Sequence, residues 1–191
     1  MNTADAVLPE PSLPAGCRCT VRRGLLSAFG ADAIICAAPP DLGISGGVRA
    51  ALYHAAGPGP FEECRFLVET RGALPAGTAC LSAAGRLQAR HLIHAVIPDW
   101  HHGSADARRR FAAALRVALA LARKHSVRSI ALPALGCDEP GWPAADAAAA
   151  AVAAVRTCLR LQPAAFDSIT WVCDDDETFA AFSQLLAAAP Q

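Results

Sequence analysis

The chain has 191 residues, of which 53% are hydrophobic and 18% are charged, so it can bury the core of one compact domain and is not disordered in composition. Its 17 basic and 17 acidic residues cancel, and a neutral surface argues against general binding to nucleic acid. The eight cysteines include no C-x-x-C pair, which argues against a zinc site and indicates reduced thiols in an intracellular protein.

The N-terminal segment differs from the remainder of the chain. Residues 1–16 are rich in proline and lack hydrophobic periodicity, so we expect a flexible tail followed by a single domain over residues 17–191. The segment lacks the apolar core of a signal peptide, and no apolar run elsewhere reaches transmembrane length without charges. We therefore expect no membrane association and a location in the cytoplasm or nucleus.

Apolar runs alternate with helical patterns along the domain, which predicts an α/β fold with a mixed, mostly parallel sheet and helices on both faces. In chain order we predict strands at 17–22 and 33–38, helices at 48–56 and 61–70, strands at 78–82 and 91–96, a helix at 106–125, a strand at 129–132, a helix at 143–161, a strand at 169–173 and a final helix after residues 174–176.

Two loops of small residues follow predicted strands and precede predicted helices. The first spans residues 39–47 and contains Gly46 and Gly47, and the second spans residues 133–142. Backbone N–H groups in such loops, with the positive end of the following helix, suit a phosphate group. Side by side, the two loops would clamp a pyrophosphate at the carboxyl ends of the strands.

Several residues have a plainer structural interpretation beside the functional one. Trp142 is equally consistent with covering a ribose and with packing inside its loop. We expect Arg49 to face solvent rather than an anion, and Asp138 and Glu139 to be surface acids rather than catalytic groups. His91 and His94 are three residues apart in a strand and face opposite sides, so they do not suggest a metal pair.

The chain resembles the macro domain family from about Cys19 to Leu186. Residues 32–39 (DAIICAAP) resemble the family's first signature strand, and Gly46-Gly47-Val48 resemble its first phosphate loop. Residues 93–100 resemble its middle signature, and residues 129–143 resemble its second phosphate loop. The middle signature looks most similar to macro domains of the multi-domain ADP-ribosyltransferases of animals. The resemblance implies a three-layer α/β/α fold.

The chain departs from the family pattern around the adenine. A family Asp that accepts a hydrogen bond from the adenine amino group is replaced in the sequence Gly24-Leu25-Leu26. The aromatic residue that stacks on adenine in the family corresponds to Cys173. The resemblance therefore implies an apolar adenine slot with weakened affinity, since each lost hydrogen bond is worth about 0.5–1.5 kcal/mol.

Other departures affect the distal ribose and the diphosphate. Two family Asn residues correspond to Cys36 and Pro39, and the Asp of the hydrolase branch corresponds to Arg49. In the second loop, the family's small residue, Thr or Ser, and Gly correspond to Gly136, Cys137 and Asp138. An acid there would repel a diphosphate unless it points outward.

We expect the domain to be a monomer that binds ADP-ribose or mono-ADP-ribosylated protein weakly and without catalysis, with no metal or cofactor. Two alternatives remain: a degenerate macro domain that serves as a protein-interaction module, and a hydrolase that removes ADP-ribose from proteins. The ligand-binding residues implied by the resemblance are Leu25, Leu26, Ile35, Cys36, Ala37, Pro39, Ser45, Gly46, Gly47, Val48, Leu135, Gly136, Cys137, Asp138, Gly141, Trp142 and Cys173.

Overall fold

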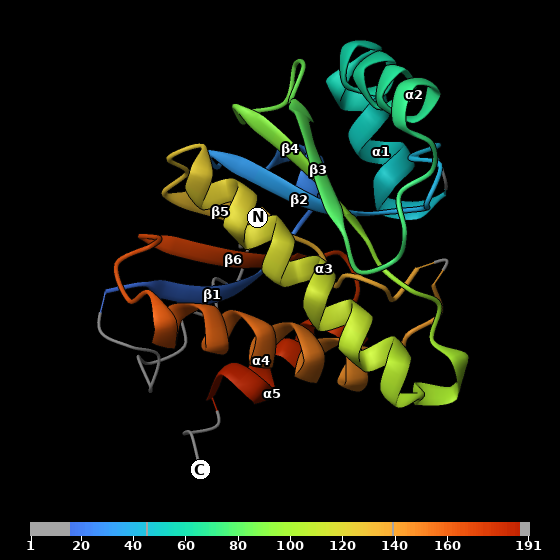
Figure 1. Ribbon diagram of the computed structural model, residues 1–191. Helices are drawn as coiled ribbons and strands as arrows, with labels where there is room; N and C mark the ends of the chain where they lie inside the picture. Colours follow the sequence, from blue (N-terminus) through green and yellow to red (C-terminus); the bar gives the residue numbers. More distant parts are fainter. Residues whose placement is uncertain (1–15, 45, 139, 188–191) are drawn as a thin grey trace.

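The computed structural model describes residues 16–44, 46–138 and 140–187, and shows a twisted sheet between two layers of helices (Figure 1). The predicted tail over residues 1–16 therefore lies almost entirely outside the described residues. In chain order the described elements are β1 (Arg18–Arg23), the 3₁₀ helix η1 (Leu26–Ala28), β2 (Ala33–Ala38), α1 (Gly47–Ala56), α2 (Gly59–Arg71), β3 (Ala79–Ala83), β4 (His91–Val96), the 3₁₀ helix η2 (His101–Gly103), α3 (Ala105–Lys124), β5 (Ser129–Leu132), α4 (Ala144–Leu161), β6 (Ser168–Cys173) and α5 (Asp176–Ala187).

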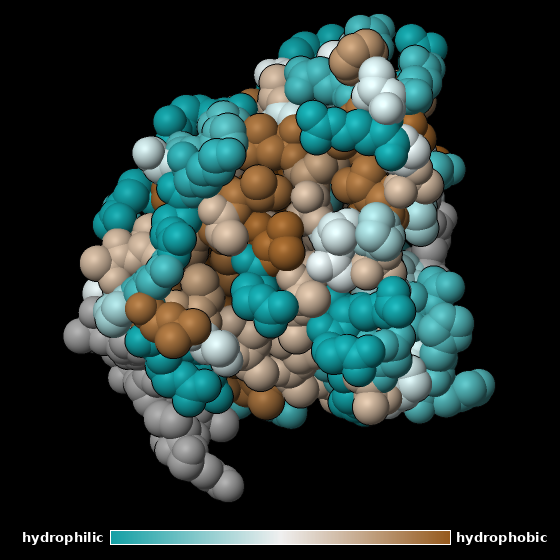
Figure 2. All heavy atoms as spheres, viewed as in Figure 1, coloured by the Kyte–Doolittle hydropathy of each residue, from teal (hydrophilic) through white to brown (hydrophobic). Residues whose placement is uncertain are grey.

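The sheet has six strands in the order β1-β6-β5-β2-β4-β3. Every neighbouring pair is parallel except β3 and β4, which are antiparallel at one edge. The prediction of a mixed, mostly parallel sheet is therefore confirmed. A space-filling view shows apolar side chains gathered over α3 and the edge strand β3, with polar side chains around them (Figure 2).

The central strand β2 is buried on both faces, which explains why its sequence is an uninterrupted apolar run. Ile34 belongs to the core cluster that includes Leu52 of α1 on one face, whereas Ile35 belongs to the cluster that includes Phe111 of α3 on the other. The helices α1 and α2 cover the first face, and α3, α4 and α5 cover the second. The expected three-layer α/β/α architecture is confirmed.

The connections after β2 and β5 leave the sheet in opposite directions. These two strands are parallel neighbours, but β2 leads to α1 on one face and β5 leads to α4 on the other. A crevice forms at the carboxyl ends of the strands wherever neighbouring connections diverge in this way. The sheet topology thus brings the two predicted loops together at one crevice.

Most predicted elements are present, with small shifts at their ends. The strands β2, β4 and β5 have the predicted bounds, because each is an apolar run closed by proline, glycine or polar residues. Helix α2 begins two residues earlier than predicted, at Gly59, since Pro60 is tolerated in a first helical turn. Within the described residues no helix combines the length and the apolar character that a membrane span requires.

Candidate functional site

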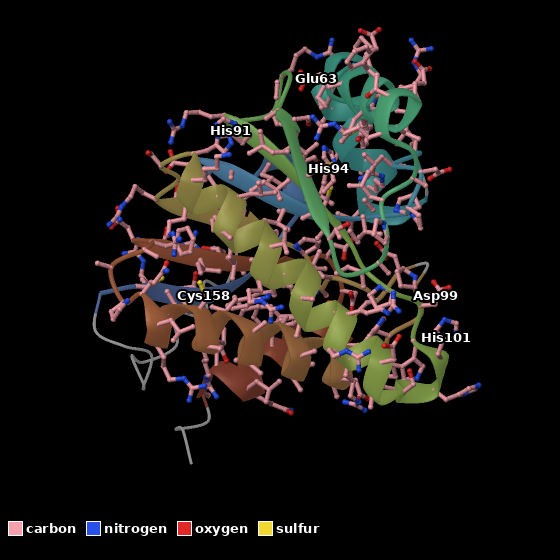
Figure 3. The ribbon with its side chains drawn as sticks, viewed as in Figure 1. Glu63, His91, His94, Asp99, His101 and Cys158 are labelled. Atoms are coloured by element: carbon pink, nitrogen blue, oxygen red, sulfur yellow. The ribbon has the colours of Figure 1, made fainter. Side chains whose placement is uncertain are left out.

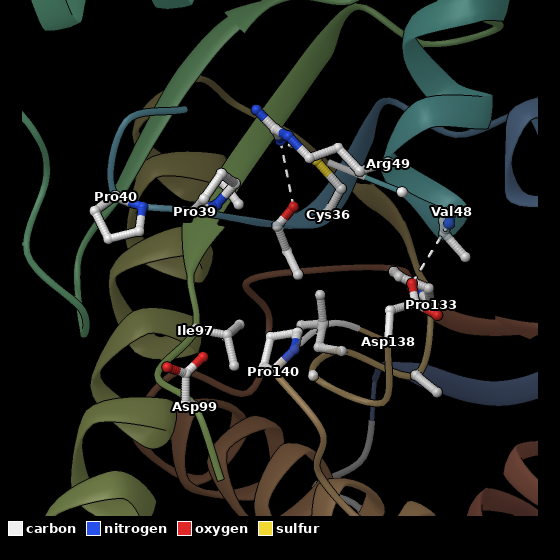
Figure 4. A pocket seen from close by; sticks show the side chains of 16 residues that line it. Cys36, Pro39, Pro40, Val48, Arg49, Ile97, Asp99, Pro133, Asp138 and Pro140 are labelled. Atoms are coloured by element: carbon white, nitrogen blue, oxygen red, sulfur yellow. Dashed lines mark hydrogen bonds between the residues drawn. The ribbon is translucent and has the colours of Figure 1, made fainter. Parts of the chain in front are cut away.

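A cavity of about 110 Å³ opens at the crevice between the ends of β2, β4 and β5 (Figure 4). Pockets for drug-sized molecules usually measure about 300–1,000 Å³, so this cavity encloses only part of a ligand as large as a dinucleotide. Eight of the predicted ligand-binding residues line it: Cys36, Ala37, Pro39, Gly46, Val48, Leu135, Gly136 and Asp138.

Asp138 places a carboxylate at the N-terminus of α1. Its Oδ2 accepts a hydrogen bond from the backbone N–H of Val48 at 3.4 Å (Figure 4). A β-carbon added to Gly47 would lie 2.8 Å from the same oxygen, so the missing side chain of Gly47 lets the carboxylate approach. The positive end of α1, which suits an anionic ligand, is thus already in contact with an anion of the protein.

Arg49 is buried, and the expectation that it faces solvent is wrong. Its side chain is 4% exposed, and its guanidinium donates to the carbonyl oxygens of Gly43 and Leu42, both at 2.7 Å, and of Ala37 at 3.3 Å. It also donates to the hydroxyl of Tyr53 at 3.1 Å. The free carbonyl groups of the loop after β2 draw Arg49 inward, and Arg49 in turn fixes the shape of that loop.

Cys36 and His94 lie beside Arg49 beneath the same loop. The Cys36 Sγ is 3.6 Å from His94 Nδ1, and the His94 Nε2 is 2.9 Å from the hydroxyl of Ser82. Burial raises the pKa of the Cys36 thiol, but His94 and Arg49 lower it, and the balance lies below the ordinary thiol value. Burial lowers the pKa of His94, whereas its interactions with Cys36 and Cys64 raise it to about 9.

The two histidines of β4 face different surroundings, as their spacing predicts. His94 lies inside the molecule, 0% exposed, whereas His91 at the start of the strand stacks edge-on against His125 (Figure 3). Asp99 lies beyond the other end of β4, where it lines the cavity. In the close view, Asp99 lies on one side of the cavity and Asp138 on the other (Figure 4).

Trp142 is packed into the core. It is 2% exposed, its Nε1 donates to the carbonyl of Pro98 at 2.8 Å, and its ring contacts Phe111 and Trp100. Trp142 therefore packs inside its loop and does not line the cavity. Pro140, from the same loop, does line it. The hydrogen bond to Pro98 ties the β5–α4 loop to the segment after β4.

The predicted adenine slot lies at the ends of β1 and β6, outside the lining of the cavity. The N–H of Gly24 donates to the carbonyl of Cys173 at 3.0 Å, which brings Leu25 and Leu26 beside that strand end. Leu25 is 64% exposed, whereas Leu26 and Cys173 are 4% and 1% exposed. These residues therefore offer one exposed apolar side chain rather than a formed slot.

Other predicted residues also lie outside the lining. Ile35 belongs to the core against α3, Gly47 faces Asp138, and Ser45 is outside the described residues. The remaining two, Cys137 and Gly141, are in the β5–α4 loop. Lining residues that the predicted set omits are Ala38, Pro40, Arg49, Ile97, Asp99, Pro133, Ala134 and Pro140. Most of these directly follow β2, β4 or β5, so proximity to a strand end is the signal that could have identified them.

Comparisons with known proteins agree with the fold. The macro domain family model matches residues 35–151. The O-acetyl-ADP-ribose deacetylase of Klebsiella pneumoniae (strain 342) is 37% identical over 168 residues, which cover 87% of this chain and 95% of that protein. A macro domain-containing protein of Cupriavidus necator is 35% identical over 167 residues, covering 87% and 96% of the two chains.

Solved structures show the same architecture. The Oceanobacillus iheyensis macrodomain with ADP has a TM-score of 0.85 at 24% identity, covering 93% of this chain and 94% of that chain. The Trypanosoma brucei macrodomain in complex with ADP-ribose has a TM-score of 0.75 at 26% identity, covering 88% and 68%. The named relatives include bacterial deacetylases, so the suggested similarity to animal ADP-ribosyltransferases is not supported. The chain belongs to the macro domain family.

Proposed function

We propose that the cleft binds ADP-ribose, or ADP-ribose attached to a protein, weakly and without hydrolysing it. The observation that supports this most directly is the cavity between the N-terminus of α1 and the β5–α4 loop, at the switch point of the sheet. Related macrodomains have been solved with ADP and with ADP-ribose. Gly46 and Val48 would offer backbone N–H groups to the diphosphate.

We expect weak binding because of Asp138 and Leu25. A diphosphate at the N-terminus of α1 would meet the Asp138 carboxylate, so that side chain must rotate away or tolerate repulsion. Leu25, in place of the family Asp, offers adenine an apolar side chain and no hydrogen-bond acceptor. Both features lower affinity without altering the fold.

The expectation that the bond between ADP-ribose and a protein is not hydrolysed rests on Pro39 and Arg49, which stand where the resemblance places the Asn and Asp of the hydrolase branch. Hydrolysis requires a side chain that holds and orients a water molecule beside the reacting carbon. Pro39 lines the cavity but has neither a polar side chain nor a backbone N–H. Arg49 lines it too, but its guanidinium donates to the loop carbonyls and cannot act as a base.

A second candidate is deacetylation of O-acetyl-ADP-ribose, which the names of the bacterial relatives favour. The carboxylates of Asp99 and Asp138 both line the cavity, and either could accept a proton from water. Acetate release from O-acetyl-ADP-ribose, lost in Asp99→Asn or Asp138→Asn while ADP-ribose still binds, would establish this activity. No release above the rate without protein would exclude it.

Calorimetric titration of the folded protein with ADP-ribose, with AMP as the control, tests the main proposal. Micromolar affinity for ADP-ribose and little heat from AMP are expected. Nanomolar affinity would contradict the weakening assigned to Asp138 and Leu25. No heat at high ligand concentration would instead favour the degenerate domain that binds proteins.

The variant Leu25→Asp separates a weak binder from a degenerate domain. Since Leu25 is exposed, the substitution should leave the fold intact. A weak binder should gain affinity for ADP-ribose but not for its hypoxanthine analogue, which lacks the amino group. A degenerate cleft should bind neither ligand after the substitution.

A further inference from the structure

A cluster of buried ionisable groups that has no part in the proposed function lies beneath the loop after β2. Arg49, Cys36 and His94 are 4%, 1% and 0% exposed. Their polar atoms form a triangle: Arg49 Nη1 lies 3.5 Å from Cys36 Sγ and 3.2 Å from His94 Nδ1, and Sγ lies 3.6 Å from Nδ1. Three elements, α1, β2 and β4, hold these atoms in place.

Arg49 makes this cluster positive. A guanidinium stays protonated in proteins, and a buried charge is costly unless an opposite charge compensates it. Among the described residues, the groups that contact the Arg49 guanidinium are carbonyl oxygens, the Tyr53 ring and hydroxyl, Cys36 and His94, with no carboxylate. Cys36 is the only member of this set that readily acquires negative charge near neutral pH.

The protonation state of His94 does not change this conclusion. If Nδ1 accepts a hydrogen from Arg49, the ring is neutral and Nε2–H donates to Ser82, whose hydroxyl donates to the Ala83 carbonyl. If Nδ1 carries a hydrogen, it donates to Cys36, and the ring adds a second positive charge when Nε2 is protonated as well. In both cases negative charge on Cys36 is the nearest compensation.

We propose that Cys36 is a thiolate paired with the Arg49 guanidinium, and that it is the residue at which hydrogen peroxide oxidises this protein. Cys36 and Arg49 both line the cavity, so the cleft is the side from which a peroxide molecule would approach the buried sulfur. The neighbouring Arg49 guanidinium and His94 ring favour the thiolate, which is the reactive form of cysteine. The eight cysteines, all within the described residues, form no disulfide that would remove this thiol.

The reaction consumes one peroxide. The Cys36 sulfur forms a bond to one peroxide oxygen, the O–O bond breaks, and the other oxygen leaves as hydroxide and takes a proton from solvent. The sulfur loses two electrons and the peroxide gains them, which leaves a neutral sulfenic acid. Arg49 then loses its negative partner, and the loop that Arg49 holds loses part of its support.

Cys64 is the rival site within the same region. The Tyr53 hydroxyl donates to its Sγ at 3.4 Å, and neighbours, Cys80 first, lower the pKa of Cys64 to about 4. However, the cavity lining includes Cys36 and not Cys64. Both residues can therefore hold negative charge, but only Cys36 combines it with the Arg49 contact and access from the cleft.

Peptide mass spectrometry of the wild-type protein tests the assignment. The protein is treated with hydrogen peroxide at neutral pH in the presence of dimedone, which forms a stable adduct with sulfenic acid. The adduct is expected first at Cys36, ahead of the other seven cysteines. An adduct first at Cys64 or at the more exposed Cys137, or no adduct at all, would overturn the proposal.

The ultraviolet absorbance of thiolates gives a second readout that needs no oxidant. At neutral pH, Cys36→Ser should lose the absorbance of one thiolate. The matched variant Cys64→Ser should retain the absorbance of the Cys36 thiolate. No loss of absorbance in Cys36→Ser would refute the proposal, whether or not Cys64→Ser loses the absorbance of a second thiolate. Circular dichroism confirms that each variant is folded, and the wild-type adduct decides the matter if Cys36→Ser does not fold.

Discussion

The Asp138 carboxylate lies against the first turn of α1, with Oδ2 3.4 Å from the amide nitrogen of Val48. Asp138 comes from the loop after β5 and Val48 from the helix after β2, so this contact joins the two sides of the cleft. The protein thus places its own anion where the helix end would attract the anion of a ligand.

Replacing Asp138 with Asn should tighten binding of ADP-ribose about tenfold, or about 1.4 kcal/mol, because the substitution removes a negative charge beside the diphosphate. Calorimetry measures the change. Adenosine, which carries no phosphate, should bind equally to both proteins. Asp174→Asn, at an exposed acid outside the cavity, is the matched control. Equal ADP-ribose affinity in wild type and Asp138→Asn would mean that the Asp138 carboxylate moves away from the diphosphate without a cost in free energy.

The fold was predictable because its signals are local. Each of β2, β4 and β5 is an apolar run whose end is marked by the next residues, and the alternation with helices indicates a mostly parallel sheet. The strand order is not local, and it decides that the segment after β4 meets the loop after β2. For this reason the predicted set of site residues omitted Ile97 and Asp99.

The directions of the side chains in the site were harder to predict from the sequence than the positions of the loops. Arg49 is at a helix start, where charged residues are usually exposed, but the carbonyl groups of Leu42 and Gly43 are turned toward it. These carbonyl groups are oriented by a loop in which Leu42 has a positive φ of 55°, and no sequence pattern predicts that conformation. The inward position of Trp142 was equally hard to predict, because its ring donates a hydrogen bond to the carbonyl of Pro98, which is 44 residues away in the chain.

Gly47→Ala should lower the free energy of unfolding by about 1–2 kcal/mol. Gly47 has a φ of 58°, a left-handed conformation that costs other residues about this much, and its new β-carbon would press on Asp138. Chemical denaturation measures the loss. Adding Asp138→Gly should recover the part due to the contact and leave the part due to φ.

Gly59→Ala is the matched control for this prediction. Gly59 also begins a helix, and a β-carbon there meets nothing within 4 Å. The control should be as stable as wild type or more stable, since alanine favours helix. If both variants had equal stability, the φ of Gly47 and its contact with Asp138 would be energetically unimportant.

Arg49→Met should destabilise the protein by about 3 kcal/mol, because it leaves buried carbonyl oxygens without a donor and Cys36 without its cation. Urea unfolding gives the difference in free energy. Arg71→Met, at the exposed end of α2, removes a similar side chain and should change stability little. A small loss in Arg49→Met would show that water replaces the guanidinium without cost.

Acid should lower the free energy of unfolding partly by protonating Asp32. Its Oδ2 accepts hydrogen bonds from the backbone N–H groups of Arg128 at 2.8 Å and Ser129 at 2.9 Å, and Arg90 lies 3.3 Å from its Oδ1. The bond from Arg128 lowers the pKa of Asp32 most; burial opposes it, and the bond from Ser129 and the charge of Arg90 add to the lowering.

Because the folded pKa of Asp32 lies below the unfolded value of about 3.9, the charged carboxylate stabilises the native state fully above that pH. The stabilisation is lost as pH falls through the lower, folded pKa. Asp32→Asn should therefore be less stable than wild type at neutral pH, and its free energy of unfolding should fall less between about pH 5 and pH 2. Denaturation at a series of pH values measures both slopes. Parallel curves would mean that other carboxylates carry the acid sensitivity, and that the tie between the start of β2 and the start of β5 does not depend on the charge of Asp32.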